Sequence, residues 1–240
     1  MARISRQELK HDEFVESVAE ATGYLRGHGR TIAIAAGIVV AVLIAVFGYR
    51  LYAERQSIRA ETALGKAMQT FHARLRQPAD PAVRDEPDEI TFASDSIKYQ
   101  SALKEFGDLA QKYPRTRVAR VARYYSALSQ IQLGQAEAAS RTLEELAASD
   151  DREISSLAKF QMAQLYQRSG KWSDSEKLLR QIIQNPTFSV SKAAAEMTLA
   201  DQLRRKNPAE AIKLYEQVRN QFPTSPLADT AKERLDELKR

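Results

Sequence analysis

A short pattern of residues recurs four times in the C-terminal part of the chain at nearly even spacing. Each copy begins with a small residue, at Ala102, Ala139, Ser175 and Ala211, so that successive copies start 37, 36 and 36 residues apart. A leucine or an aromatic residue stands four positions further on, and an aliphatic residue stands three positions after that. Apolar residues spaced in this way lie on one face of a helix. A fixed period of this length therefore predicts an array of stacked helical units.

Each copy is the second helix of a predicted helix pair. The small residue allows this helix to cross the first one closely, and the larger residue fills the space between the two. Gly134 and Gly170, which are also 36 residues apart, are expected to end the first helices. The complete pairs are predicted at Arg117–Leu133 with Gln135–Ala148, Ser155–Ser169 with Lys171–Gln184, and Val190–Arg205 with Pro208–Gln221.

Further helices are predicted at both ends of the array. Glu54–Arg76 is expected to be a helix that opens a first pair with Ser94–Lys112. Between them, Gln77–Ala93 contains three prolines and five acidic residues and is expected to be a loop. At the far end, Pro226–Lys239 is a charged amphipathic helix of the kind that caps a repeat array.

This spacing resembles the tetratricopeptide repeat, whose usual period is about 34 residues. The resemblance extends from about Ser94 to the end of the chain, and Pro114 and Pro223 follow the first and last copies as the terminating proline. The leading tryptophan and the Leu-Gly pair of that repeat are not kept. The resemblance implies an all-α fold, an α-solenoid whose first helices line a concave face.

A stretch of nineteen residues near the N-terminus, Thr31–Tyr49, contains no charged side chain. As a helix it would be about 28 Å long, close to the thickness of the hydrocarbon core of a membrane. Arginines and tyrosines flank it on both sides, as they do at membrane interfaces. A cleavable signal peptide is the competing interpretation, but its apolar core is shorter and follows a short basic start. The pattern favours an uncleaved transmembrane helix.

This span divides the chain into four predicted segments. Residues 1–30 form a tail with a short amphipathic helix, residues 31–52 the transmembrane helix, residues 53–93 a membrane-proximal helix with the acidic loop, and residues 94–240 the repeat domain. Five basic residues precede the span and four follow it within twenty residues, so the positive-inside rule leaves its orientation open.

One face of the predicted transmembrane helix carries a small residue at every fourth position. Such a stripe allows a partner helix to approach closely, although it also arises by chance in alanine-rich spans. The candidate packing face consists of Ala33, Gly37, Ala41 and Ala45.

Few features of the sequence point to chemistry. The chain has no cysteine, which excludes disulfides, thiolate metal sites and a lipid-modified cysteine. Its three histidines lie far apart, and it has no phosphate-binding loop or nucleophile motif. The net charge of +5 is dispersed, and its densest cluster, Arg204–Lys206, ends a predicted helix, where cations favour the helix dipole. Trp172 is interpreted as a packing residue. We therefore expect no catalysis, cofactor, metal, small-molecule substrate or nucleic-acid partner.

The concave face of the array is the remaining candidate for a functional surface. The tetratricopeptide register places aromatic, amide and charged side chains of the first helices near it, and several of these also fit the core between repeats. Such a mixture suits a peptide or a protein partner. The candidate binding residues are Tyr124, Leu128, Phe160, Gln164, Gln167, Arg168, Glu196 and Arg204.

A short tail, one span and a tetratricopeptide domain together resemble the YfgM-like ancillary subunits of the bacterial Sec translocon. That resemblance implies a single-pass protein of the bacterial inner membrane with a cytoplasmic N-terminus. Its periplasmic repeats would link translocon components to periplasmic chaperones or client polypeptides. The resemblance is one of architecture and assigns no site residues. The alternatives are an envelope scaffold for cell division or outer-membrane assembly, a cytoplasm-facing adaptor, and a subunit of an enzyme whose catalysis resides in a partner.

Overall fold

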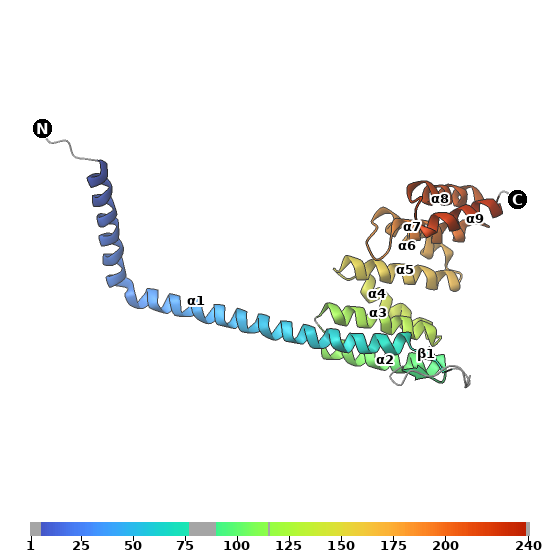
Figure 1. The fold of residues 1–240 in the computed structure, drawn as a ribbon, viewed down its shortest axis with the longest axis horizontal. Coiled ribbons are helices and arrows are strands. Elements are labelled where there is room, and N and C mark those ends of the chain that lie inside the picture. The colour runs from blue at the N-terminus through green and yellow to red at the C-terminus, as the bar shows by residue number, and fades with distance from the viewer. Residues whose placement is uncertain (1–5, 77–89, 115, 239–240) are drawn as a thin grey trace. The chain divides into compact units, whose positions relative to one another are not determined.

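A computed structural model of the chain describes residues 6–76, 90–114 and 116–238, and within them the fold is all-α apart from one pair of very short strands (Figure 1). In the first helix, side chains are described at position 34, at 37–50 and from 54 onward. The chain forms two compact units, residues 1–56 and residues 57–240. The elements in chain order are α1 (Arg6–His72), β1 (Arg74–Leu75), β2 (Thr91–Phe92), α2 (Asp95–Lys112), α3 (Arg117–Gln132), α4 (Ala136–Ala147), α5 (Arg152–Arg168), α6 (Trp172–Gln184), α7 (Lys192–Leu203), α8 (Pro208–Gln221) and α9 (Pro226–Leu238).

The predicted solenoid of helix pairs is confirmed. From α2 onward each helix packs against the next one in sequence, and α9 also packs on α7 at the C-terminal end. From α2 to α9 the helix bounds differ from the predicted ones by up to three residues. The largest difference is in α5, which begins at Arg152 because the Asp151 side chain caps it by accepting hydrogen bonds from the amides of Glu153 and Ile154.

The tight turns inside the helix pairs follow from two glycines. Gly134 and Gly170 have φ angles of +74° and +75°, a left-handed conformation that other residues rarely adopt. After α3, the Gln135 amide donates to the carbonyl of Gln130, and the Gly134 amide donates to that of Ile131. Lys171 and Gly170 make the equivalent pair of bonds after α5. Both turns are therefore Schellman motifs, in which the last carbonyls of the helix remain hydrogen-bonded.

The repeated small and large residues form the core, as their spacing predicted. Ala102, Ala139, Ser175 and Ala211 are each 0% exposed, and so are the larger residues four positions after each of them. Three clusters of buried residues run along the array, one from α1 to α3, one from α3 to α5 and one from α5 to α9.

The junction between α1 and α2 differs from the prediction. The helix ends at His72 instead of Arg76, and Arg74–Leu75 pairs with Thr91–Phe92 as two short parallel strands. Thr91 and Phe92 belonged to the predicted loop, of which residues 77–89 lie outside the described part of the chain. Main-chain pairing between segments this short follows from tertiary proximity and has no periodic signal in the sequence. The expected opening repeat is formed. Ala67 is buried in the same cluster as Phe106, and the Phe71 ring packs edge-on against the Phe106 ring, with 6.2 Å between the ring centroids.

Within the described residues, one helix is long and apolar enough to cross a membrane, and it lies in α1 from Gly37 onward. None of the apolar stretch that qualifies it is buried by the rest of the chain. The amphipathic helix predicted for the tail also falls within α1, whose backbone is helical from Arg6. The side chains of that tail lie outside the described residues.

Candidate protein-binding surfaces

Several residues predicted for the concave face contribute to the core between repeats. Tyr124 is only 6% exposed, and Leu128 is half-buried against the same cluster between α3 and α5. Burial raises the pKa of the Tyr124 hydroxyl to about 12. Phe160 packs, partly buried, against the cluster that extends from α5 to α9. These aromatic and aliphatic residues stabilise the array and offer little surface to a partner.

Glu196 is the most enclosed of the predicted residues, at 1% exposed in α7. Its Oε1 lies 3.5 Å from the Lys192 ammonium one turn earlier, and its Oε2 is buried without a hydrogen-bond partner. Burial raises the pKa of this carboxyl, and the neighbouring ammonium opposes the shift. Apolar residues are buried on most sides of α7, so its spacing does not separate an inward face from an outward one.

Gln167 joins successive repeats. Its side-chain amide donates to Gln202 Oε1 at 2.9 Å, and the same oxygen accepts a 2.9 Å bond from the buried Ser175 hydroxyl. The Gln202 amide in turn donates to the backbone carbonyl of Trp172 at 2.8 Å. This network connects α5, α6 and α7 and fixes the backbone where α6 begins.

The remaining predicted residues lie at or near the surface. Gln164 is half-buried, and Arg168 is exposed beside a shallow hollow of about 250 Å³ that Ile131 also lines. Arg204 is half-buried at the end of α7, where its guanidinium bonds to Glu237 of α9 at 2.9 Å. Of the predicted set, Gln164, Arg168 and Arg204 are therefore the side chains best placed to meet a partner.

A cleft of about 550 Å³ lies beside Arg204, between the first turn of α6 and the ends of α7 and α9. Trp172 lines it and is 50% exposed, so this residue packs only in part, contrary to its sequence interpretation. Arg205 and Lys206 also line the cleft, and neither forms an ion pair within the described part of the chain. One sequence signal could have revealed this surface: Trp172 stands 36 residues after Ala136, so a large aromatic residue replaces a small one in the repeat.

The small-residue stripe on α1 is exposed where it is described. Gly37, Ala41 and Ala45 have no covering residues, and a Cβ added at Gly37 would meet nothing within 4 Å. The side chain of Ala33 lies outside the described residues.

Comparison with known families agrees with this architecture. The family model described as a tetratricopeptide repeat-like domain matches residues 24–239. The chain belongs to this family. No curated protein matches the chain significantly.

Membership of the tetratricopeptide repeat-like family indicates a role in protein–protein interaction, since such domains are typically non-catalytic scaffolds. Among the residues that the structure describes, no group of three or more histidine, aspartate or glutamate side chains could hold a metal ion. Two clefts between helices are lined in part by cationic and amide side chains, and Trp172 and Asp201 line one of them.

Proposed function

We propose that this chain is a membrane-anchored scaffold that binds other proteins through its helical repeats. The observation that carries the proposal is the cleft at Trp172, which Arg205 and Lys206 also line. The Trp172 side chain is half-exposed, so the core of the array does not enclose it. Tryptophan and arginine are enriched at the energetic centres of protein interfaces. The Gln202 bond to the Trp172 backbone holds this surface in place before a partner arrives.

The partner-binding face proposed here combines that cleft with the exposed remainder of the predicted concave residues. It consists of Trp172, Arg205 and Lys206 of the cleft together with Gln164, Arg168 and Arg204. Of the other predicted residues, Tyr124, Leu128 and Phe160 pack in the core of the array, Gln167 hydrogen-bonds to Gln202, and Glu196 is buried in α7.

The exposed side chains of α1 support a membrane anchor. From Ile38 to Phe47 its large apolar side chains are 51–67% exposed. Exposed apolar surface is unfavourable in water by about 25 cal/mol per Å², and a hydrocarbon environment removes that penalty. The stripe formed by Ala33, Gly37, Ala41 and Ala45 is proposed to contact a second transmembrane helix.

The proposed location is the bacterial inner membrane, with the N-terminus in the cytoplasm and the repeats in the periplasm. There the repeats would link the Sec translocon to periplasmic chaperones or client polypeptides. This assignment relies on the likeness of tail, span and repeats to the YfgM-like ancillary subunits, and the charges around the span do not decide it.

A reporter that is active in only one compartment, fused after Arg240, tests the orientation. Activity in the periplasm is expected. Activity confined to the cytoplasm would exclude the link to periplasmic chaperones and favour the cytoplasmic adaptor.

Crosslinking of the full chain in its native membranes, followed by identification of the partners, tests the function. We expect secretion or chaperone components among the adducts, and fewer adducts from an Arg205→Glu/Lys206→Glu variant. The matched control reverses two exposed cations elsewhere in the array, Arg141→Glu and Lys213→Glu. Recovery of cell-division or outer-membrane assembly proteins alone would replace the Sec assignment, and recovery of no protein partner would refute the scaffold.

A further inference from the structure

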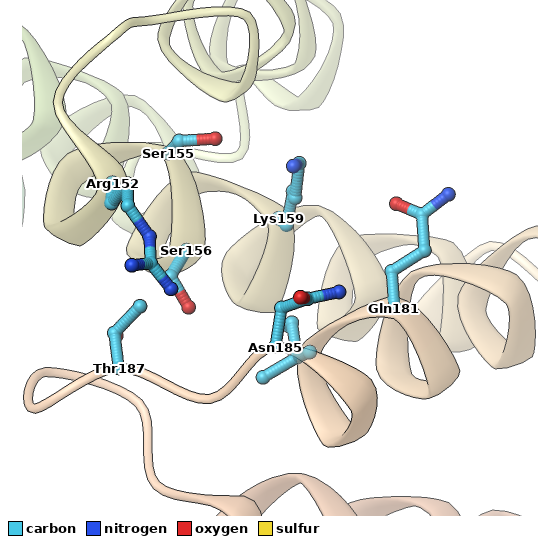
Figure 2. Close-up of a pocket in the computed structure, with 8 residues that line it drawn as sticks. Arg152, Ser155, Ser156, Lys159, Gln181, Asn185 and Thr187 are labelled. Atoms are coloured by element: carbon cyan, nitrogen blue, oxygen red, sulfur yellow. The ribbon is translucent and has the colours of Figure 1, made fainter.

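A second cleft lies between the first half of α5, the end of α6 and the loop of residues 185–191 (Figure 2). Its volume is about 490 Å³. None of the residues that line it is acidic, and most of them are polar. Those that bear on its function are Arg152, Ser156, Lys159, Gln181, Asn185 and Thr187.

Two cations of this cleft have no anionic partner. Arg152 is the first residue of α5, and Lys159 follows two helical turns later on the same face. Neither side chain forms an ion pair within the described part of the chain. A pair of free cations in a cleft without carboxylates favours the binding of an anionic group.

A buried hydroxyl lies between these cations in the sequence. Ser156 is 6% exposed, and its Oγ is buried without a hydrogen-bond partner, whereas the Oγ of the adjacent Ser155 donates to the Ala147 carbonyl at 2.6 Å. Figure 2 shows the Ser156 hydroxyl and the Arg152 guanidinium on the same side of the cleft, near Thr187. Buried polar groups are normally hydrogen-bonded, so this unpaired donor is available to an acceptor from outside the chain.

The acids on either side of Arg152 in the sequence, Asp151 and Glu153, make their contacts elsewhere in the protein. Asp151 caps α5 and lies 3.3 Å from the Arg117 guanidinium. The Glu153 carboxylate accepts hydrogen bonds from the backbone amides of Ser189 at 2.8 Å and Phe188 at 3.4 Å. A hydrogen bond from the Ser189 side chain, together with these backbone bonds, lowers the pKa of Glu153, because hydrogen bonds of this kind favour the charged carboxylate. Asp151 and Glu153 therefore interact with other groups of the protein and form no ion pair with Arg152 or Lys159.

Next to the cleft, the loop presents an aromatic side chain to solvent. Phe188 is 99% exposed, and it directly follows Thr187 of the cleft lining. Besides the bonds to Glu153, the Thr187 amide donates to the Val190 carbonyl at 3.1 Å, and the Val190 amide donates to the Thr187 hydroxyl at 3.2 Å. A fully exposed phenylalanine on a hydrogen-bonded loop has the properties of an anchor residue for an apolar contact.

We propose that this cleft binds an acidic peptide segment of a partner protein. One carboxylate of the peptide accepts hydrogen bonds from Arg152 and the Ser156 hydroxyl, a second carboxylate pairs with Lys159, and an adjacent apolar side chain of the peptide packs on Phe188. The inference deepens the proposed scaffold function and rests on it, since it names the chemistry of one partner segment.

Two other occupants fit these observations less well. A free inorganic anion would use the cations and the hydroxyl but would leave Phe188 without a role. A membrane surface would bury Phe188, but a flat surface would not enter the cleft to reach the buried Ser156 hydroxyl. A peptide with acidic residues beside an apolar residue satisfies all of these groups.

The test uses the full chain in detergent micelles and a dye-labelled synthetic peptide in which one leucine is flanked by glutamates. One twin of this peptide has glutamines in place of the glutamates, and another has serine in place of the leucine. Binding is measured by fluorescence anisotropy. We expect the Arg152→Ala/Lys159→Ala variant to bind the acidic peptide at least about tenfold more weakly, because two charge-assisted contacts are lost. Phe188→Ser is expected to weaken binding of the leucine peptide several-fold and to leave binding of the serine peptide unchanged.

Arg141→Ala/Lys213→Ala removes the same charge from exposed positions on α4 and α8 and serves as the matched control, with no change expected. An equal loss in this control would show a non-specific charge effect and refute the site, as would equal binding of the glutamine peptide. Full competition by inorganic phosphate would show that the natural ligand of the site is a free anion and not a peptide. If a photo-crosslinking residue at position 188 labels only lipid in native membranes, the surface contacts the membrane and not a peptide. If the scaffold still crosslinks to its partners while the Arg152→Ala/Lys159→Ala variant is unaffected in every assay, this inference fails and the proposed function stands.

Discussion

Replacement of Gly170 with alanine isolates the contribution of one backbone conformation to the stability of the array. The residue has a φ of +75°, and a Cβ built on it would meet nothing within 4 Å, so the substitution introduces no clash. The main cost is therefore conformational: an L-residue in the left-handed region raises the free energy of the folded state by roughly 1–2 kcal/mol. The lower entropy of alanine in the unfolded chain offsets about 0.4–1 kcal/mol of this. We therefore expect Gly170→Ala to destabilise the protein by about 1 kcal/mol.

The matched control is Gly107→Ala in the interior of α2. This glycine also has nothing within 4 Å of an added Cβ, but its φ is not positive. Alanine is preferred over glycine in a helix interior by about 1 kcal/mol, so this variant should be more stable. The two glycine-to-alanine changes are thus predicted to have opposite signs.

Thermal unfolding of the full chain in detergent, followed by far-UV circular dichroism, measures both effects. For a chain of this size about 1 kcal/mol corresponds to a shift in Tm of roughly 2–4 °C, downward for Gly170→Ala and upward for Gly107→Ala. Gly170→Asn should lose less than Gly170→Ala, because asparagine tolerates the left-handed conformation better. A stabilising Gly170→Ala, or a fall of similar size for both alanine variants, would show that the turn conformation does not limit stability.

Three further variants test the core, a helix cap and a buried charge. Leu143→Ala removes a 0% exposed core residue and should cost about 2–5 kcal/mol in chemical denaturation, and a cost below that of Arg141→Ala would contradict the predicted core. Asp151→Ala removes the cap of α5 and should cost about 1–2 kcal/mol, with a smaller loss for Asp151→Ser, which keeps a capping oxygen. Burial raises the pKa of the Glu196 carboxyl in the folded state, so the unfolded chain loses this proton at a lower pH. The free energy of unfolding therefore falls as pH rises from the unfolded pKa of this group through its folded pKa. Glu196→Gln should therefore be more stable than the parent near neutral pH and equal to it in acid, and a pH-independent difference would refute the assignment.

The helical pairs were predictable because their signal is local. A small residue and a large residue four positions later recur in all four copies, and a glycine ends the first helix in two of the pairs, at Gly134 and Gly170. All of these are properties of one helix and its ends. The period therefore predicted both the helix pairs and the residues at their crossing points, of which Ser175 and Leu179 are examples that are 0% exposed. The apolar stretch in α1 was predictable for a similar reason, since length and absence of charge suffice to identify it.

The residues of the candidate surfaces were harder to predict. Tetratricopeptide register placed Glu196 and Tyr124 on a surface, whereas both are buried. Whether a first-helix side chain faces a neighbouring repeat or solvent depends on how each pair rotates against the next, and that rotation has no counterpart in the spacing. The Gln202 network shows the same dependence, because it joins groups on α5, α6 and α7 that only stacking brings within 3 Å.

Sequence alone thus determined the helices of the array, the core of each pair and the segment suited to a membrane, whereas the short strands at the start of the array were not predicted. Tertiary structure alone brought Trp172 beside the cations at the end of α7, placed Phe188 on a loop held by Glu153, and left the Ser156 hydroxyl without a partner. The physical reason is range. Helix formation and helix-pair crossing depend on residues within one repeat, whereas clefts form where side chains from different helices meet, and their shape is decided by packing across the whole array.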